Sequence, residues 1–167
     1  LTANTTGASN TAVGKSSLAA NTTADNNVAI GPAAMFTNTT GTTNTAVGSG
    51  ALQSNTTASN NTAMGYAALN ANTTGSQNTV VGNIAGDAIT TGSNNSALGY
   101  EALGKSTTGG DNVAVGRAAA LDNTTGGGNV AVGVEALENN STGDNNVAVG
   151  KQAGRGSSMT GSANTVM

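Results

Sequence analysis

The feature that most constrains this chain is a strict 17-residue repeat. One glycine returns at that interval from end to end, as Gly14, Gly31, Gly48, Gly65, Gly82, Gly99, Gly116, Gly133 and Gly150. An unbroken period of this length indicates stacked copies of one small unit, as in a solenoid. We therefore expect residues 1–167 to form a single repeat array. Because the sequence begins and ends within a repeat, we expect a segment of a longer fibre.

Positions in the repeat are counted from this glycine, which is position 0. Position −1 is always apolar, as in Val13 and Ile30, and position −2 is alanine in every copy except Val80. Successive residues of a strand point to opposite faces, so apolar residues at both positions predict a short strand covered on both sides. Position −1 is accordingly expected to be buried.

Two further parts of each coil can be predicted. Positions +3 and +4 are usually alanine and leucine, as in Ala51-Leu52, and predict a second buried point. Positions +7 to +10 follow the pattern of Asn38-Thr39-Thr40-Gly41 and predict a third extended piece that ends in a glycine turn. Threonine, valine, asparagine and two glycines per repeat all disfavour helix. The predicted fold class is all-β, a parallel β-solenoid or β-roll of about ten coils.

Asparagine occupies position −4 in all copies, including Asn27 and Asn44. Stacked coils place equivalent side chains about 4.7–4.8 Å apart, so these amides are expected to hydrogen-bond from coil to coil. The five Lys and Arg and the eight Asp and Glu residues fall only at positions +1, +2, +5, +6, +11 and +12. Tyr66, Tyr100 and Phe36 obey the same rule, at +1 and +5. We expect these positions to be solvent-facing turns.

The apolar residues also predict self-association. Each coil offers only about four apolar side chains against roughly 1–2 kcal/mol of backbone entropy for every residue ordered. A second apolar strand face on a surface chain is most simply covered by another copy of the chain. The sequence therefore predicts a homo-oligomer, a trimer or a filament.

Composition excludes several classes of function. The chain has no cysteine and no histidine, so disulfides, thiolate or imidazole catalysis and His/Cys metal sites are ruled out within it. With a net charge of −3 it has no basic surface for nucleic acid. No apolar run approaches the roughly 18 residues of a membrane span, so no membrane insertion is expected in this segment. No cofactor is expected either.

Carboxylates are the only catalytic candidates. Glu101 and Glu135 share position +2 two coils apart, or about 9–10 Å by strand spacing, which loosely fits an inverting glycosidase pair. Two solvated turn residues are the simpler interpretation, so we assign no catalytic residue and expect no enzyme. The scattered Asp25, Asp111 and Asp144 form no repeating calcium motif, and we assign no metal site.

Two surface features have alternative interpretations. Threonine recurs at position +9, and with the residue at +7 it would form a flat array, either for ice binding or simply for sheet stability. The same segment contains N-x-Thr sequons, which are glycosylation sites in secreted eukaryotic proteins but arise easily in Asn/Thr-rich sequences. These sequons are at Asn4, Asn21, Asn38, Asn55, Asn72 and Asn123.

The motif Asn-x-Ala-Val/Ile-Gly-x-x-Ala, as in residues 27–34 and 146–153, resembles the head repeats of trimeric autotransporter adhesins. It is also similar to Asn-Thr-Thr-Gly-containing repeats of phage tail fibres. The resemblance covers the whole chain, although the 17-residue period is longer than is typical of those heads. It implies a left-handed parallel β-roll trimer whose surface binds a host matrix or receptor.

Together these features favour an extracellular structural and adhesive fibre segment, on a cell surface or a virion, with a host-surface glycan or matrix receptor as partner. One alternative is a purely structural filament, glycosylated or not. The other is a tailspike-like solenoid that degrades polysaccharide.

Overall fold

A computed structural model describes residues 1–156 and 161–167, and this part of the chain contains ten short strands and no helix. The strands are β1 Thr11–Val13, β2 Val28–Ile30, β3 Thr45–Val47, β4 Thr62–Met64, β5 Thr79–Val81, β6 Ser96–Leu98, β7 Val113–Val115, β8 Val130–Val132, β9 Val147–Val149 and β10 Thr165–Val166.

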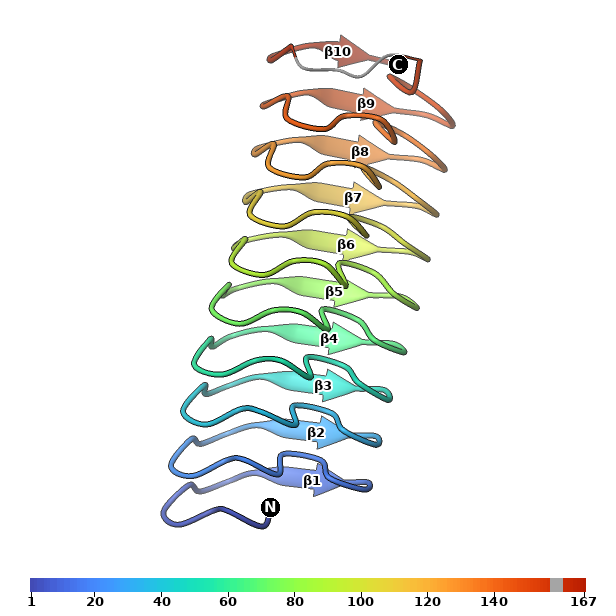
Figure 1. The fold of residues 1–167 in the computed structure, drawn as a ribbon. Coiled ribbons are helices and arrows are strands. Elements are labelled where there is room, and N and C mark those ends of the chain that lie inside the picture. Colours follow the sequence, from blue (N-terminus) through green and yellow to red (C-terminus); the bar gives the residue numbers. More distant parts are fainter. Residues whose placement is uncertain (157–160) are drawn as a thin grey trace.

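The ten strands form one parallel sheet in chain order (Figure 1). Pairing is one-for-one from β1 to β9, so that Thr45 pairs with Thr62 and Ala46 with Ala63. At about 4.8 Å per strand the stack is roughly 43 Å long. The predicted all-β parallel solenoid with a 17-residue period is therefore confirmed.

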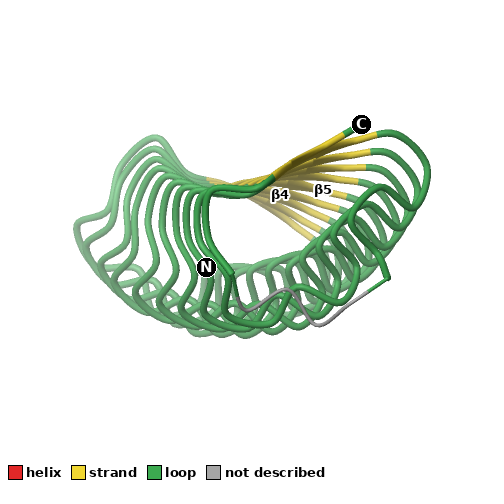
Figure 2. Ribbon diagram, turned by 90° about the horizontal axis from the view of Figure 1, so that it is seen from above, coloured by secondary structure: helices red, strands yellow, loops and turns green. Residues whose placement is uncertain are grey.

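Each coil has one strand, and bends and turns complete it. Viewed down the rod, the strands lie on one side and the loop segments close the ring (Figure 2). We call positions −4 to 0 the strand wall, positions +1 to +6 the return wall and positions +7 to +10 the far corner. The predicted third extended piece is wrong, because the far corner contains no strand. There Asn38 donates from Nδ2 to the carbonyl of Gly41 at 3.0 Å and closes a bend instead.

Small and large apolar residues fill the interior of the coil. Alanine at −2 and at +3 and leucine at +4 are buried, as in Ala46, Ala51 and Leu52, which confirms the second buried point. The coil with Gly86 at +4 lacks this leucine. Ile89 and Val80 fill its place, since their side chains lie 3.0 and 3.4 Å from where a Gly86 Cβ would be.

Position −1 points away from this interior. Val13 is 56% and Leu98 52% exposed, so the expectation that position −1 is buried is wrong for a single chain. The reason is the alternation of side chains along a strand, which turns position −1 outward once alanine at −2 points in. The solenoid covers only one face of its sheet.

Sharp bends let each coil close within a single repeat. Residues at −5, +2 and +4 adopt left-handed backbone, including Leu52 with φ 52° and Met35 with φ 48°. The recurring glycine has a φ that only glycine adopts easily, 147° at Gly82. A Cβ on Gly82 would also lie 2.2 Å from the carbonyl oxygen of Gly99 in the next coil. Position 0 therefore requires glycine for conformation and for close stacking.

Candidate functional site

The asparagines at −4 form a buried column that joins successive coils. Asn27 accepts at Oδ1 from the backbone N–H of Asn44 at 2.9 Å, and Asn44 in turn accepts from that of Asn61 at 2.9 Å. The Nδ2 of Asn44 donates to the carbonyl of Ala58, 14 residues further along the chain. The predicted coil-to-coil bonding is confirmed, with the backbone as its main partner.

A second column of asparagines runs through the far corner at +7. Asn55 donates from Nδ2 to Oδ1 of Asn38 in the preceding coil at 2.7 Å and to the carbonyl of Ala58 at 3.0 Å. The carbonyl of Ala58 thus accepts from both columns. The sequence patterns missed this second column, although the frequent return of asparagine at +7 could have indicated it.

The second column contains the predicted glycosylation sites. Asn4 is exposed, but the other five sequon asparagines are fully buried and donate from the nitrogen that would carry the sugar. These five are Asn21, Asn38, Asn55, Asn72 and Asn123. A glycan on any of them would displace the far corner, which argues against glycosylation of the folded coils.

The second column is also interrupted. Ile89 and Ser106 replace asparagine at +7 in two successive coils. Within the described residues, Asn72 Oδ1 and Ser106 Oγ are buried without a hydrogen-bond partner. The orphaned Asn72 oxygen follows directly from Ile89, because an isoleucine side chain has no donor.

The predicted threonine array has a different form. Threonine at +8 donates its hydroxyl to the next coil, as from Thr39 to the Thr56 carbonyl at 3.0 Å, so the threonine that joins coils lies at +8, whereas the prediction concerned +9. Threonine at +9, such as Thr40 and Thr57, is exposed. Because asparagine at +7 is buried, +7 and +9 do not share a surface, and the flat two-residue array is not formed.

Of the two candidate glutamates, Glu135 is not a solvated turn residue. Its side chain is only 12% exposed and forms ion pairs with Arg117 and Arg155, the latter at 2.8 Å. Gln152 donates from Nε2 to Oε2 of Glu135 at 2.8 Å. Hydrogen bonds from Gln152 and Arg117 lower the pKa of Glu135 below its ordinary value. The expectation that every charged position faces solvent is wrong here, because neighbouring coils supply cations on both sides.

This environment is unsuited to acid catalysis, since a glycosidase general acid needs a raised pKa. Glu101 is half-buried at the equivalent position. The scattered aspartates bond to backbone, as Asp25 does to the N–H of Ala8 at 2.6 Å and Asp144 to that of Gly127 at 2.7 Å. Among the described residues, no group of three or more acidic side chains could hold a metal ion.

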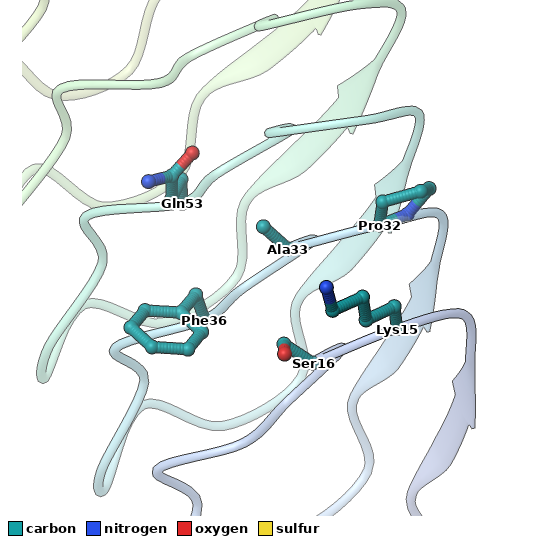
Figure 3. A pocket seen from close by; sticks show the side chains of 6 residues that line it. All are labelled: Lys15, Ser16, Pro32, Ala33, Phe36 and Gln53. Carbon is teal, nitrogen blue, oxygen red and sulfur yellow. The ribbon is translucent and has the colours of Figure 1, made fainter.

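A shallow pocket of about 250 Å³ opens on the return wall of the first coils. Figure 3 shows its lining side chains, which come from three successive coils. Lys15 and Ser16 come from the first, Pro32, Ala33 and Phe36 from the second, and Gln53 from the third. The pocket combines an aromatic ring and a proline ring with one ammonium and one amide group.

The outer face of the strand wall is a second distinct surface. Position −1 of successive strands presents an apolar stripe that follows the whole sheet, and position −3 beside it is valine in four coils and threonine or serine in the others. Its most exposed large members besides Val13 and Leu98 are Val149 at 44%, Met64 at 42% and Ile30 at 39%. A contiguous apolar stripe of this kind is typical of a surface that another molecule covers.

In the described part of the chain, no helix is long and apolar enough to cross a membrane. Comparison of the chain with protein-family models, curated proteins and solved structures gave no match. The resemblance to adhesin heads and tail fibres therefore rests on the repeat motif alone.

Proposed function

We propose that this chain is a structural and adhesive segment of an extracellular fibre, on a cell surface or a virion. The observation that carries the proposal is the one-for-one register of parallel strands along the chain, which makes a gently twisted rod with equivalent positions repeated in each coil. A repeated surface binds by avidity, because many weak contacts add along the rod.

The proposal includes self-association through the strand wall. Val13, Met64 and Leu98 expose large apolar side chains along one line, and a second copy of the chain offers the same stripe for packing. Return-wall side chains stay accessible in such an assembly, because they project from a different side of the coil. A trimer in the manner of adhesin heads is one such assembly.

Light scattering tests the assembly directly. We expect the purified chain to have a mass that is a multiple of 15.9 kDa. Met64→Lys with Leu98→Lys should reduce it to 15.9 kDa, because two charges would be buried at the interface. Thr57→Lys with Thr91→Lys adds the same charge at exposed far-corner positions and is the matched control. A monomeric wild-type chain would contradict self-association.

Adhesion is tested by comparing the assembled chain with the monomeric variant on immobilised matrix and on cells. The assembly should be retained much longer, since avidity depends on the number of copies. Equal retention of the two forms would contradict the avidity mechanism.

The two alternative functions have less support. A glycan-coated filament has less support, because five of the six glycosylation sites predicted from the Asn-Thr-Thr motif are buried. A polysaccharide hydrolase is disfavoured by Glu135, whose lowered pKa and two arginine partners suit an ion pair rather than a proton donor.

A further inference from the structure

All three aromatic residues of the chain are exposed on the return wall. Phe36 is 41%, Tyr66 60% and Tyr100 47% exposed, and the interior contains no aromatic side chain. Large rings ordinarily supply most of a buried core, so a set of rings left outside on one side of a rod suggests a binding surface.

Position +1 forms a continuous column on this wall, which turns gradually with the twist of the coils (Figure 2). The carbonyl of each residue at +1 accepts from the backbone N–H at +2 of the next coil, with distances of 2.9 Å at Pro32, Ser49 and Tyr66. The same bond is 3.3 Å at Asn83 and 2.8 Å at Tyr100. The residues at +1 in five successive coils are thus stacked by backbone hydrogen bonds, and those two coils apart are about 9.6 Å from each other by strand spacing.

The chemistry of this column alternates. Pro32, Tyr66 and Tyr100 carry rings on every second coil, aromatic in the two tyrosines, whereas Ser49 and Asn83 between them carry exposed hydrogen-bonding groups. The pocket lies at the Pro32 end, where Phe36 adds a second ring and Lys15 and Gln53 add polar groups (Figure 3). A hydrogen bond with Glu101 raises the pKa of the Tyr100 hydroxyl above its ordinary value.

We propose that the return wall between the pocket and Tyr100 binds a β-1,4-linked glycan in extended conformation; this deepens the proposed adhesive function and rests on it. In such a glycan, alternate sugars are inverted, so one apolar C–H face recurs with a two-sugar period that is close to the two-coil spacing. Every second sugar stacks its C–H face on a ring at +1. The sugars between them place hydroxyl groups near Ser49 and Asn83. The end of the glycan enters the pocket beside Lys15 and Gln53.

Other extended polymers fit less well. Single-stranded nucleic acid also stacks on aromatic residues, but it needs a positive groove, and this wall carries Asp87 and Glu101. A polyproline II peptide has a turn of about 9.3 Å, near the ring spacing, and binds aromatic-lined grooves. Its carbonyl oxygens can accept from Ser49 and Asn83, but it has no N–H or O–H to donate to their side-chain oxygens, so the alternating column favours a ligand rich in hydroxyl groups, which both donate and accept.

Calorimetric titration of the full chain with cellohexaose and with chitohexaose tests the proposal. We expect at least one of these β-1,4-linked hexasaccharides to bind, and the α-1,4-linked maltohexaose not to bind. Tyr66→Ala and Tyr100→Ala should each weaken binding roughly tenfold, and Tyr66→Phe should leave it nearly unchanged because the ring remains. Both tyrosines are exposed, and circular dichroism checks that the variants stay folded.

Three results would overturn the proposal: neither hexasaccharide binds, binding is unaffected by loss of both tyrosines, or maltohexaose binds equally well. Tyrosine-dependent binding of a deca-proline peptide without glycan binding would instead make this wall a polyproline site and would also overturn it. The proposed fibre function is contradicted by different results: a monomeric mass in light scattering, or equal retention of the assembled and monomeric forms. A chain that assembles and adheres independently of Tyr66 and Tyr100 would refute the glycan site alone.

Discussion

The strand wall and the far corner each contain one asparagine column and one recurring glycine, but only the strand wall repeats them without exception. At −4, asparagine bonds to backbone groups of the next coil at both ends of its amide. At +7, asparagine bonds to another side chain and to a carbonyl that already has a donor from −4. Loss of a residue at −4 therefore orphans buried backbone, whereas Ile89 at +7 orphans one side-chain oxygen. In this chain, a position tolerates substitution according to which buried hydrogen-bonding groups the substitution would leave without a partner.

The largest expected effect comes from the strand-wall glycine. Gly82→Ala should destabilise the chain by roughly 4 kcal/mol, from strained backbone and from overlap with Gly99. The matched far-corner change, Gly75→Ala, also brings a Cβ close to a carbonyl oxygen, that of Gly92, but the backbone there is not left-handed. Ala24 and Ala58 already occupy the equivalent position, so this change should cost less, about 1–2 kcal/mol. Urea unfolding followed by circular dichroism measures both. Equal losses would remove the distinction between the two regions.

Asparagine-to-alanine variants compare how much the two asparagine columns contribute to stability. Asn95→Ala should cost roughly 3 kcal/mol, because it leaves the Asn112 N–H without an acceptor and the Gly109 carbonyl without a donor. Ser106, at +7 in that coil, forms no hydrogen bond within the described residues that could replace the lost donor. Asn61→Ala should cost about 2–3 kcal/mol, since Asn72 still donates to the carbonyl of Gly75.

At +7, Asn55→Ala should cost about 1–2 kcal/mol, because Asn44 still serves the carbonyl of Ala58. The exposed Asn83→Ala is the control and should change the free energy of unfolding by less than about 0.5 kcal/mol. The order Asn95, Asn61, Asn55 is the test, measured in the same urea experiment. A larger loss at Asn55 than at Asn95 would contradict the assignment of roles.

Lowering the pH tests how much the ion pairs of Glu135 stabilise the C-terminal coils, because the asparagine columns do not titrate. The lowered pKa of Glu135 contributes stability that is present above its ordinary value of 4.5 and is lost as pH falls through the folded-state pKa. Hydrogen exchange should therefore show β8 and β9 losing protection below pH 4.5 before β3 and β4 do. Glu135→Gln should abolish this difference. Asp87, whose pKa burial raises, acts in the opposite sense and cannot produce the loss.

The smallest expected effect is a repair of the interrupted column. Ser106→Asn should stabilise the chain by about 0.5–1.5 kcal/mol, because the new amide can donate to the Gly109 carbonyl and accept from Asn123. Ile89→Asn supplies a donor to Asn72 as well but should destabilise, since it empties the space beside Gly86 and Val80. Thermal unfolding should show a higher midpoint temperature for Ser106→Asn and a lower one for Ile89→Asn. Stabilisation by Ile89→Asn would show that hydrogen bonding outweighs packing in that coil.

Much of the fold could be predicted from the sequence, because each coil must place equivalent residues in register. The period, the parallel sheet, the interior positions and the column at −4 all follow from that requirement. The outward direction of Val13 and Leu98 could not, since a three-residue strand of apolar residues does not show which face is inside. The left-handed backbone at Met35 and Leu52 was also hidden, because neither residue type favours it. Gly50, Gly86, Gly128 and Gly154, at the same left-handed positions, were the available signal.

The candidate sites were less predictable than the fold. Burial of Glu135 depends on Arg117 and Arg155 from neighbouring coils, and the charge pattern alone suggested only exposed turns. The Asn-Thr-Thr motif has two interpretations, a glycosylation site and a structural asparagine at +7. The sequence does not distinguish them, whereas burial of the asparagine favours the structural role. Pro32, Tyr66 and Tyr100 recur every second coil at a position that the charge pattern already predicted to face solvent, so this spacing was visible in the sequence, although no prediction used it.

The hydrogen bonds between coils lie nearly along the rod, and this sets how the rod responds to tension. A pull along its length loads those bonds one layer at a time, so the coils should peel open in succession rather than rupture together. Each freed coil releases the extended length of one whole repeat, which is many times the spacing between layers. A tether built in this way would lengthen in even steps under load and spare its attachment points from sudden force.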